Sequence, residues 1–367
     1  MNFNHTRLIF ARMLRGKSQK EMADFLGVTQ RSIRAYENGD YVPEKIDLIA
    51  DYLGFPITFF EKESIELISD QAISFRAKST LSAKLKNQAK ATVLIAEEFN
   101  KKIECLFQLS DLDIPDLSEL TPEQAAVSLR NHWGLGSHPI DNMIELLEEK
   151  GVRVFSLEMD SSIDANCRWD NDQPYIFLNQ NKSAERSRFD AAHELGHLVR
   201  DRYIDIIDDT REKEANSFAS AFLMPEDSLR IRAPSFVTVQ GLIELKKYWG
   251  VSVAALAYRM YQLELMPERV YTRIICPSIS KMGYRTSEPE EMERETSLLW
   301  DQIKTLLDEE GISIQQIAEE LSLNLKDIHD LTFNIFKSTS EKLIAIKGGA
   351  DGNIPNSINE KSHLRVV

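Results

Sequence analysis

The first 60 residues have hydrophobic positions at the three- and four-residue spacing of short amphipathic helices. Within residues 18–39 this pattern predicts a helix, a tight turn and a second helix, with Gly27 at the turn because glycine tolerates the left-handed conformation that ends a helix. Thr29 can cap the second helix, whose Ile33 faces inward. The apolar residues of the first helix are Met22, Ala23, Phe25 and Leu26.

Further along, the pattern alternates between helices and strands. Residues 71–115 are expected to be mostly helical, and the acidic stretch 110–122, with its two prolines, to be a linker. Thr121 and Gln124 then form the capping box of a new helix. Runs of β-branched and aromatic residues predict strands over 152–157 and 174–179, and an extended stretch over 269–277. Further helices are predicted over 139–150, 183–202, 210–223, 238–248, 252–263 and 288–310.

The C-terminal part contains a helix-turn-helix-like pattern that is acidic. Residues 313–331 contain it, and their charge favours a small helical packing module over a DNA reader. The final stretch, 347–367, combines Gly, Asn and Pro without periodicity, which predicts a disordered tail.

Composition places the chain among globular proteins of two or three domains. It has 367 residues, 43% of them hydrophobic and 28% charged. No apolar run is long enough for a transmembrane helix, and the N-terminus lacks the features of a signal peptide. The cysteines Cys105, Cys167 and Cys276 form no paired framework, which favours the reducing cytoplasm. We therefore expect a cytoplasmic protein without a membrane partner.

The net charge of −14 argues against nucleic-acid binding for the chain as a whole, but the charge is unevenly distributed. Residues 1–36 hold seven Lys or Arg against two acidic residues, or +5, so the remainder carries −19. A basic N-terminal head is compatible with DNA binding that weakens steeply with salt.

The outer face of the second helix carries the side chains that could read DNA. Gln30, Arg31, Ser32 and Arg34 can reach base edges and phosphates in a major groove. Gln19, in the first turn of the preceding helix, is placed to bind a backbone phosphate. A small helical bundle that only dimerises would show the same apolar pattern, so this alternative stays open.

Residues 5–60, including "SQKEMADFLGVTQRSIRAYENG", closely resemble the helix-turn-helix of the Xre/Cro/C1 repressor family. The resemblance implies binding to a double-stranded DNA operator, as a homodimer on paired half-sites. It also implies a structural role for the acidic residue Glu37.

A second chemical motif lies in "RFDAAHELGHLVRD". His193 and His197, four residues apart, lie on one face of a helix and can bind one metal ion. Glu194 follows the first histidine and can act as a general base on metal-bound water.

A catalytic zinc site needs a third protein ligand and an open position. Glu214 is the better candidate, because it shares a helix face with Phe218 and Phe222 and would otherwise be a costly buried charge. Glu212, on another face, is the weaker candidate. Mixed histidine and carboxylate ligation favours Zn²⁺.

The blocks "SAERSRFDAAHELGHLV" and "EANSFASAFLMPE", with "AISFRAKS" from residue 72, resemble the ImmA/IrrE metallopeptidases over about 72–230. The resemblance implies a zincin-like fold with His193, His197 and Glu214 as zinc ligands and Glu194 as catalytic base. It also implies a protein substrate, since members cleave Xre-type repressors. From the residues alone the inference stops at a metal-dependent hydrolase.

Two further features could serve a peptidase. The strand "PYIFLN" could be an edge strand that docks an extended peptide, or equally a core strand. Tyr203 and Tyr258 are candidate oxyanion donors, with nothing to choose between them.

These features predict a multidomain, mainly α protein. An all-α helix-turn-helix domain (1–65) precedes an α+β zincin-like metallopeptidase domain (66–265, with 71–115 as a helical linker). A helical C-terminal module (266–346) and the tail (347–367) follow.

The favoured function is a DNA-binding transcriptional regulator with a zinc-dependent endopeptidase that cleaves a repressor-type protein, in a stress, phage or mobile-element response. The alternative is a repressor or antitoxin whose metallopeptidase-like domain senses a ligand or binds a partner without proteolysis. Self-cleavage would satisfy both. A general degradative protease is disfavoured, because it would gain nothing from a DNA-binding domain.

Overall fold

The computed structural model describes residues 3–66, 74–75, 82–158, 165–204 and 208–337. The chain begins with five short helical elements: α1 (His5–Leu14), α2 (Gln19–Leu26), α3 (Gln30–Asn38), α4 (Ile46–Leu53) and the 3-10 helix η1 (Ile57–Glu61). Gly27 adopts a φ of 68° and ends α2, while the Thr29 side chain caps α3. The predicted pair of helices with its glycine turn is confirmed.

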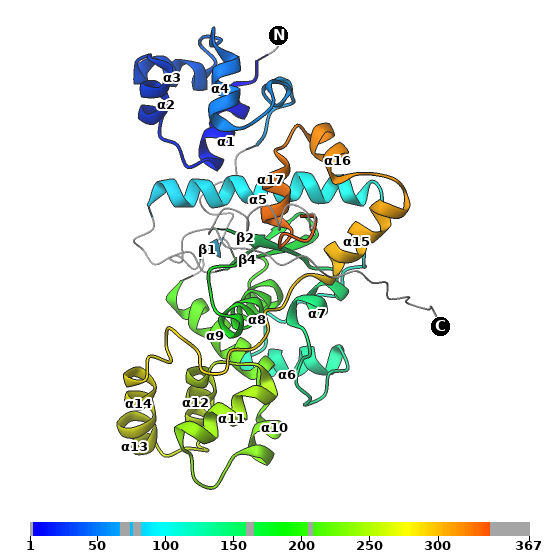
Figure 1. The fold of residues 1–367 in the computed structure, drawn as a ribbon. Coiled ribbons are helices and arrows are strands. Elements are labelled where there is room, and N and C mark those ends of the chain that lie inside the picture. Colours follow the sequence, from blue (N-terminus) through cyan, green and yellow to red (C-terminus); the bar gives the residue numbers. More distant parts are fainter. Residues whose placement is uncertain (1–2, 67–73, 76–81, 159–164, 205–207, 338–367) are drawn as a thin grey trace, which may run out of the picture.

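A long helix, α5 (Ala83–Glu104), lies between these N-terminal helices and the sheet (Figure 1). It is shorter than the expected helical stretch 71–115, because Ser82 caps its start and residues 105–120 are not helical. Its buried Val93, Ala96 and Phe99 belong to the same hydrophobic core as α1 and η1. The α5 helix is therefore packed on the N-terminal helices and is not a loose linker.

The sheet contains β1 (Ser74–Phe75), β2 (Arg153–Leu157), β3 (Asn166–Asp170) and β4 (Gln173–Asn179), in the order β1-β3-β4-β2. β2 and β4 pair in parallel, and β3 runs antiparallel to both of its neighbours. The two predicted strands are confirmed, whereas β3 has too polar a sequence to be recognised. The edge-strand interpretation of "PYIFLN" is wrong, because β4 lies between β3 and β2.

The two faces of the sheet contribute to two different hydrophobic cores. Phe155 and Tyr175 belong to the core that contains α1, α5 and the C-terminal helices. Val154 and Ile176, one position along in the same strands, belong to the core of the metal-motif helix. Successive side chains of a strand alternate between faces, so the sheet joins the two cores back to back.

The helices of the second core surround α8, which carries the metal motif (Figure 1). The Thr121–Gln124 capping box is present at the start of α6, as predicted. The bounds are α6 (Pro122–His132), α7 (Met143–Glu149), α8 (Ala184–Arg200), α9 (Asp209–Leu223), α10 (Glu226–Arg232), α11 (Val239–Trp249) and α12 (Val253–Gln262).

The extended stretch expected over 269–277 is helical instead. It forms α13 (Glu268–Val270), the π-helix η2 (Tyr271–Ile275) and α14 (Cys276–Lys281). Ile275 and Ile279 are both buried, and their four-residue separation suits one face of a helix. Tertiary burial here overrides the strand preference of the β-branched residues.

An acidic strap, defined as residues 288–297, replaces the first part of the helix expected over 288–310. Its carboxylates accept hydrogen bonds from the first backbone N–H of three helices: Glu288 from Val253 of α12 at 2.6 Å, Glu291 from Ala184 of α8 at 3.3 Å, and Glu295 from Met143 of α7 at 2.8 Å. The first N–H groups of a helix have no partner within it, and the helix dipole favours negative charge there. The strap thus holds three helices of the second core together.

The expected C-terminal module 266–346 is divided, because α13 and α14 pack with α12 in the second core. Its part from Leu298 on, called the C-terminal module below, returns to α5 and the N-terminal helices (Figure 1). It contains α15 (Leu298–Glu309), α16 (Ile314–Leu321) and α17 (Leu325–Leu331). α16 and α17 form the predicted helix-turn-helix-like pair, with Ser322 at the turn in the left-handed region (φ 55°). Ile328 and Leu331 of α17 are buried in the first core, in keeping with a packing module.

Among the described residues, no helix is long and apolar enough to cross a membrane. The stretch for which a disordered tail was expected, 347–367, lies outside the described residues.

Candidate metal centre and DNA-binding surface

His193 and His197 point their rings to one spot beside helix α8. Their Nε2 atoms are 3.1 Å apart, and both side chains are buried. Gly196 lies between them on the side that meets α9, where an added Cβ would be 3.0 Å from Phe218 and 3.4 Å from the Cα of Ala215. The glycine therefore lets α9 approach the histidine-bearing helix.

Glu212 is the carboxylate that α9 brings to the histidines. Its two oxygens are 3.4 Å from Nε2 of His193 and 3.6 Å from Nε2 of His197. One ligand atom from each of the three residues lies within 4.8 Å of the others. The donors are those of a mixed histidine and carboxylate metal site.

Glu214, the expected third ligand, is directed elsewhere. Its carboxylate accepts hydrogen bonds from Arg200 at 3.2 Å and Arg211 at 3.3 Å, and it is one-third exposed. The expectation of a buried charge on the Phe218 face is therefore wrong, since two arginines pair with it. Glu212 precedes Ala215 by one turn and so lies on the stripe of α9 that contacts Gly196.

Asp201, which sequence reasoning missed, holds the second histidine. Its carboxylate lies 2.7 Å from Nδ1 of His197 and is buried. Burial alone would lower the pKa of His197, but hydrogen bonds with Asp201 and Glu212 outweigh it and raise that pKa to about 9. Burial would likewise raise the pKa of Glu212, yet hydrogen bonds from the two histidines hold it well below its usual range.

Metal-binding histidines commonly donate their other ring nitrogen to such a carboxylate, which fixes the tautomer and leaves Nε2 free to bind. The sequence feature that could have identified Asp201 is its spacing, because it follows His197 by four residues at the end of the same helix.

Glu194 is buried on α8 next to His193 and faces strand β3. Burial is the main cause that raises its pKa to about 7. The Cys167 thiol contacts the Glu194 carboxyl group. Burial is the main cause that raises the pKa of this thiol well above its usual value, and the negative charge of Glu194 is the second cause. Cys167 is thus a neutral neighbour of a carboxyl whose pKa suits proton transfer near neutral pH.

The structure brings neither candidate oxyanion donor into a described contact with these residues. Tyr203, just after α8, is 76% exposed. Tyr258 packs in an aromatic group with Tyr261 and Tyr271, with ring centroids 6.4 and 6.2 Å away.

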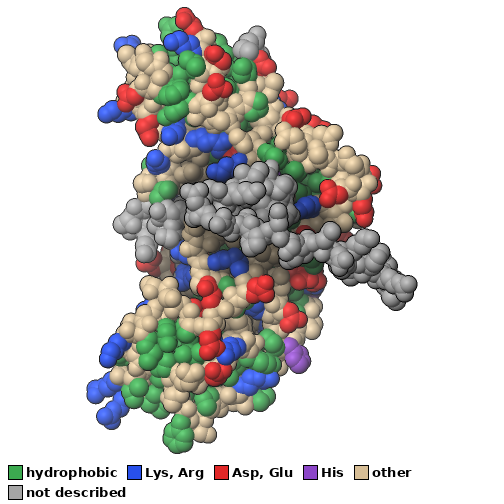
Figure 2. Space-filling view, in the orientation of Figure 1, with side chains coloured by type: hydrophobic (Ala, Val, Ile, Leu, Met, Phe, Trp, Pro, Cys, Tyr) green, Lys and Arg blue, Asp and Glu red, His purple; other side chains and the backbone are tan. Residues whose placement is uncertain are grey.

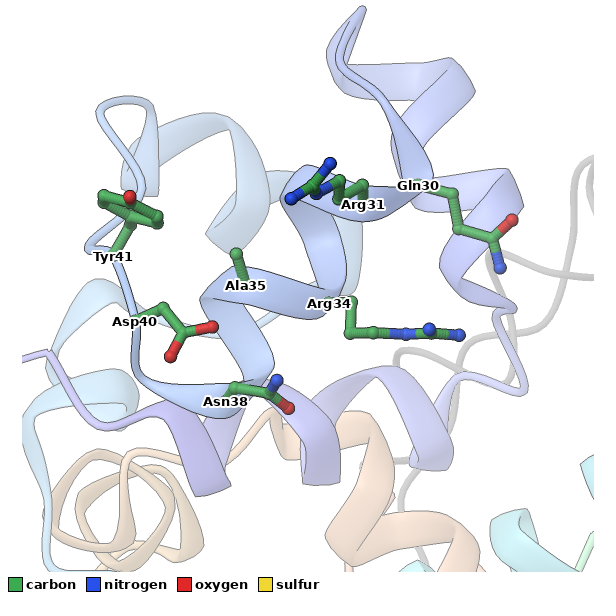
Figure 3. A pocket seen from close by; sticks show the side chains of 7 residues that line it. All are labelled: Gln30, Arg31, Arg34, Ala35, Asn38, Asp40 and Tyr41. Carbon is green, nitrogen blue, oxygen red and sulfur yellow. The ribbon is translucent and has the colours of Figure 1, made fainter.

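At the other end of the molecule, α3 presents its polar face to the outside. Gln30, Arg31 and Arg34 are exposed and line an open hollow of about 810 Å³ together with Asp40 and Tyr41 of the following loop (Figure 3). Ser32 differs from the expectation, because it is half-buried and its hydroxyl lies 2.9 Å from that of Thr29 at the helix cap.

Gln19 is engaged in a partly buried network. Its amide donates to Glu37 at 2.7 Å, and Glu37 also accepts from Arg12. Glu37 is only 6% exposed, which agrees with the structural role expected for it. The network fixes the start of α2 against α3, so Gln19 is positioned beside the recognition helix by its own hydrogen bond.

The basic residues of the N-terminal head fall into two groups. Three arginines of α1 and its C-terminus form ion pairs: Arg7 with Glu98, Arg12 with Glu37 and Arg15 with Asp327. By contrast, no carboxylate of the described residues lies within ion-pair distance of Lys17, Lys20, Arg31 or Arg34. These four charges are available to phosphates, and Figure 2 shows Lys and Arg side chains gathered where the N-terminal helices meet α5.

Comparison with protein families gives two matches. Residues 8–60 match the family model described as helix-turn-helix, and residues 147–261 match the M78 peptidase model described as IrrE N-terminal-like domain. The chain fuses a helix-turn-helix domain to an IrrE N-terminal-like domain. No curated protein matches the chain.

The second match includes the whole candidate metal centre. The IrrE N-terminal-like region runs from α7 through α12 and so contains β2–β4, α8 and α9. Both resemblances expected from the sequence motifs are thereby confirmed. The two matches support a DNA-binding regulator with a metallopeptidase-like domain. The M78 peptidase family implies a bound metal.

Proposed function

We propose that this protein is a transcriptional regulator whose helix-turn-helix domain binds double-stranded operator DNA and whose second domain is a zinc-dependent endopeptidase. Its substrate is a repressor-type protein. The observation that carries the proposal is the convergence of the buried His193 and His197 with the partly buried Glu212 beside Glu194. In addition, the arginines on the outer face of α3 have no ion-pair partner among the described residues.

The three clustered residues are the proposed zinc ligands. Two imidazole nitrogens and one carboxylate are a donor set typical of catalytic zinc, which keeps one further position open. Zinc bound there would polarise a substrate carbonyl and lower the pKa of a coordinated water. Asp201 orients His197 through Nδ1, so that Nε2 is the ligand atom.

Glu194 is the proposed general base and acid. Its pKa of about 7 allows it to accept a proton from the attacking water and later to donate one to the leaving amine. The Cys167 thiol beside it is neutral and does not compete for that proton.

The experiment is incubation of the zinc-loaded protein with a helix-turn-helix repressor encoded next to its gene. Glu194→Gln should retain the metal and lose cleavage by a factor on the order of 10²–10⁴. Glu214→Gln is the matched control, because it changes a carboxylate of α9 outside the ligand cluster. Equal cleavage by wild type and Glu194→Gln would overturn the proposed mechanism.

A second function, a repressor or antitoxin that senses a ligand without proteolysis, is favoured by one observation. The C-terminal module contacts the helix-turn-helix domain directly, for example through Arg15 and Asp327, and could transmit a signal without any cleavage. Operator footprinting with the Glu194→Gln variant tests it. Operator release on induction by this variant would favour sensing, whereas release only by the wild type would favour proteolysis.

Dimerisation remains part of the proposal. Helix-turn-helix readers commonly bind two half-sites one helical turn apart as dimers.

A further inference from the structure

The first turns of α5 lie beside the DNA-binding domain in a fixed position. The ion pair between Arg7 of α1 and Glu98 of α5, at 3.0 Å, joins the two helices in addition to their shared core. At the other end of the contact, a Cβ added to Gly16 would be 3.0 Å from the Gln88 amide oxygen and 3.1 Å from Cε of Lys84. The position of Lys84 relative to α2 and α3 is therefore set by packing.

A second hollow lies between the two parts. It measures about 300 Å³ and is lined by Lys17, Gln19 and Gln30 of the helix-turn-helix domain together with Lys84 and Asn87 of α5. Gln30 also lines the larger hollow on α3. The two hollows therefore share a wall, and the face that carries α3 continues onto α5.

Arg12, which also lines this hollow, is paired with Glu37, but the two lysines are not paired in this way. Lys84 is exposed, and in the described part of the chain no carboxylate lies within ion-pair distance of its ammonium group. The charge of Lys84 helps to lower the pKa of Glu21, after the hydrogen bonds with Ser18, but the Glu21 carboxylate is engaged in the capping box of α2, where it accepts a hydrogen bond from the backbone N–H of Ser18 at 2.7 Å. Lysine, asparagine and glutamine are among the side chains that position a protein on a DNA backbone.

We propose that Lys84 and Asn87 of α5 bind a backbone phosphate next to the base pairs read by α3. The DNA interface would then extend beyond the helix-turn-helix match at residues 8–60. The proposal rests on the DNA binding proposed above. Because α5 also packs on the sheet of the IrrE N-terminal-like domain, the bound DNA would contact a helix shared by both domains.

The test measures binding of the full-length protein to mixed-sequence duplex DNA over a range of salt concentrations. Lys84→Gln should weaken binding to all sequences and reduce the slope of log K against log salt by about 0.9, the value for one phosphate contact. Asn87→Ala should weaken binding with an unchanged slope, because it removes no charge. Lys84→Arg should retain the slope.

Lys326→Gln is the charge-matched control, since Lys326 on α17 is 75% exposed and lies outside the hollow. Arg34→Gln tests the α3 surface separately. If Lys84→Gln behaves like Lys326→Gln while Arg34→Gln weakens binding, the α5 contact is overturned and the DNA-binding function stands. If the wild type binds no duplex, both proposals are overturned.

Discussion

Arg15, at the end of the first helix, and Asp327, 312 positions later in α17, form a two-pronged ion pair. Nη1 and Nη2 of Arg15 lie 2.6 and 2.8 Å from the two carboxylate oxygens of Asp327. The same guanidinium donates to the backbone oxygen of Leu53 at 2.7 Å and lies 4.5 Å from the centre of the Phe55 ring. One side chain thus joins α1, the end of α4 and the C-terminal module.

We expect Asp327→Asn to loosen the C-terminal module from the helix-turn-helix domain. The Arg15 and Asp327 side chains are only 23% and 14% exposed, so the substitution leaves a largely desolvated guanidinium without its charged partner. The expected loss in free energy of unfolding is about 1–3 kcal/mol. Denaturant unfolding measures it, and hydrogen exchange should show faster exchange in α4 and α17.

Asp308→Asn, at an exposed position of α15, is the control for this experiment. Equal stability and equal exchange in the two variants would show that the ion pair does not hold the module in place.

The histidine pair and Glu194 were predictable from the sequence because a helix alone determines their relationship. Residues four apart lie on one face of any α-helix, so the motif needs no knowledge of tertiary structure. The same reasoning holds for Gly27 and Thr29, whose turn and cap are local. Such features follow from backbone geometry over a few residues.

The third carboxylate was not predictable in this way, because it depends on which stripe of α9 contacts α8. Apolar spacing indicated the Phe218 face and hence Glu214, but Arg200 and Arg211 pair with that carboxylate, and Glu212 lies beside the two histidines instead. The acidic strap shows the same limit. Its glutamates suit a helix by propensity, yet their carboxylates bind the N-termini of helices distant in sequence.

Glu212→Gln should weaken zinc binding far more than Glu214→Gln. Glu212 is within 3.6 Å of both histidine Nε2 atoms, whereas Glu214 is held by Arg200 and Arg211. The loss of zinc affinity for Glu212→Gln should exceed roughly 100-fold, the upper range for substitutions of residues that only hydrogen-bond to a metal ligand. Competition with a chromophoric chelator measures the affinities. The reverse order of the two variants would restore Glu214 as the ligand.

Asp201→Asn should weaken zinc binding by roughly 10–100-fold, because the carboxylate that fixes the tautomer of His197 is lost. The measurement is the same chelator competition, now with Asp209→Asn as control. Asp209 is exposed at the start of α9 and makes no described contact with the histidines. An affinity for Asp201→Asn equal to that of the control would exclude a positioning role for Asp201.

Glu148 should make the stability of the protein depend on pH. It is 4% exposed, accepts hydrogen bonds from the first two N–H groups of α15 at 3.1 and 2.9 Å, and burial raises its pKa to about 7. A carboxyl whose pKa is higher in the folded than in the unfolded state binds protons more tightly when folded. Its favourable contribution is therefore fully present below about pH 4.5 and is lost as the pH rises through about 7.

Glu148→Gln removes this titration while keeping an acceptor for α15. Relative to the wild type, the variant should gain stability as the pH rises from about 5 to about 8, by up to about 3 kcal/mol. Denaturant unfolding at several pH values measures the difference. Glu149→Gln, at the exposed neighbouring position, should show no such trend. The contrary result is a stability difference between Glu148→Gln and the wild type that stays constant over this pH range. It would show that Glu148 keeps an ordinary pKa and acts as a permanently charged cap at the start of α15.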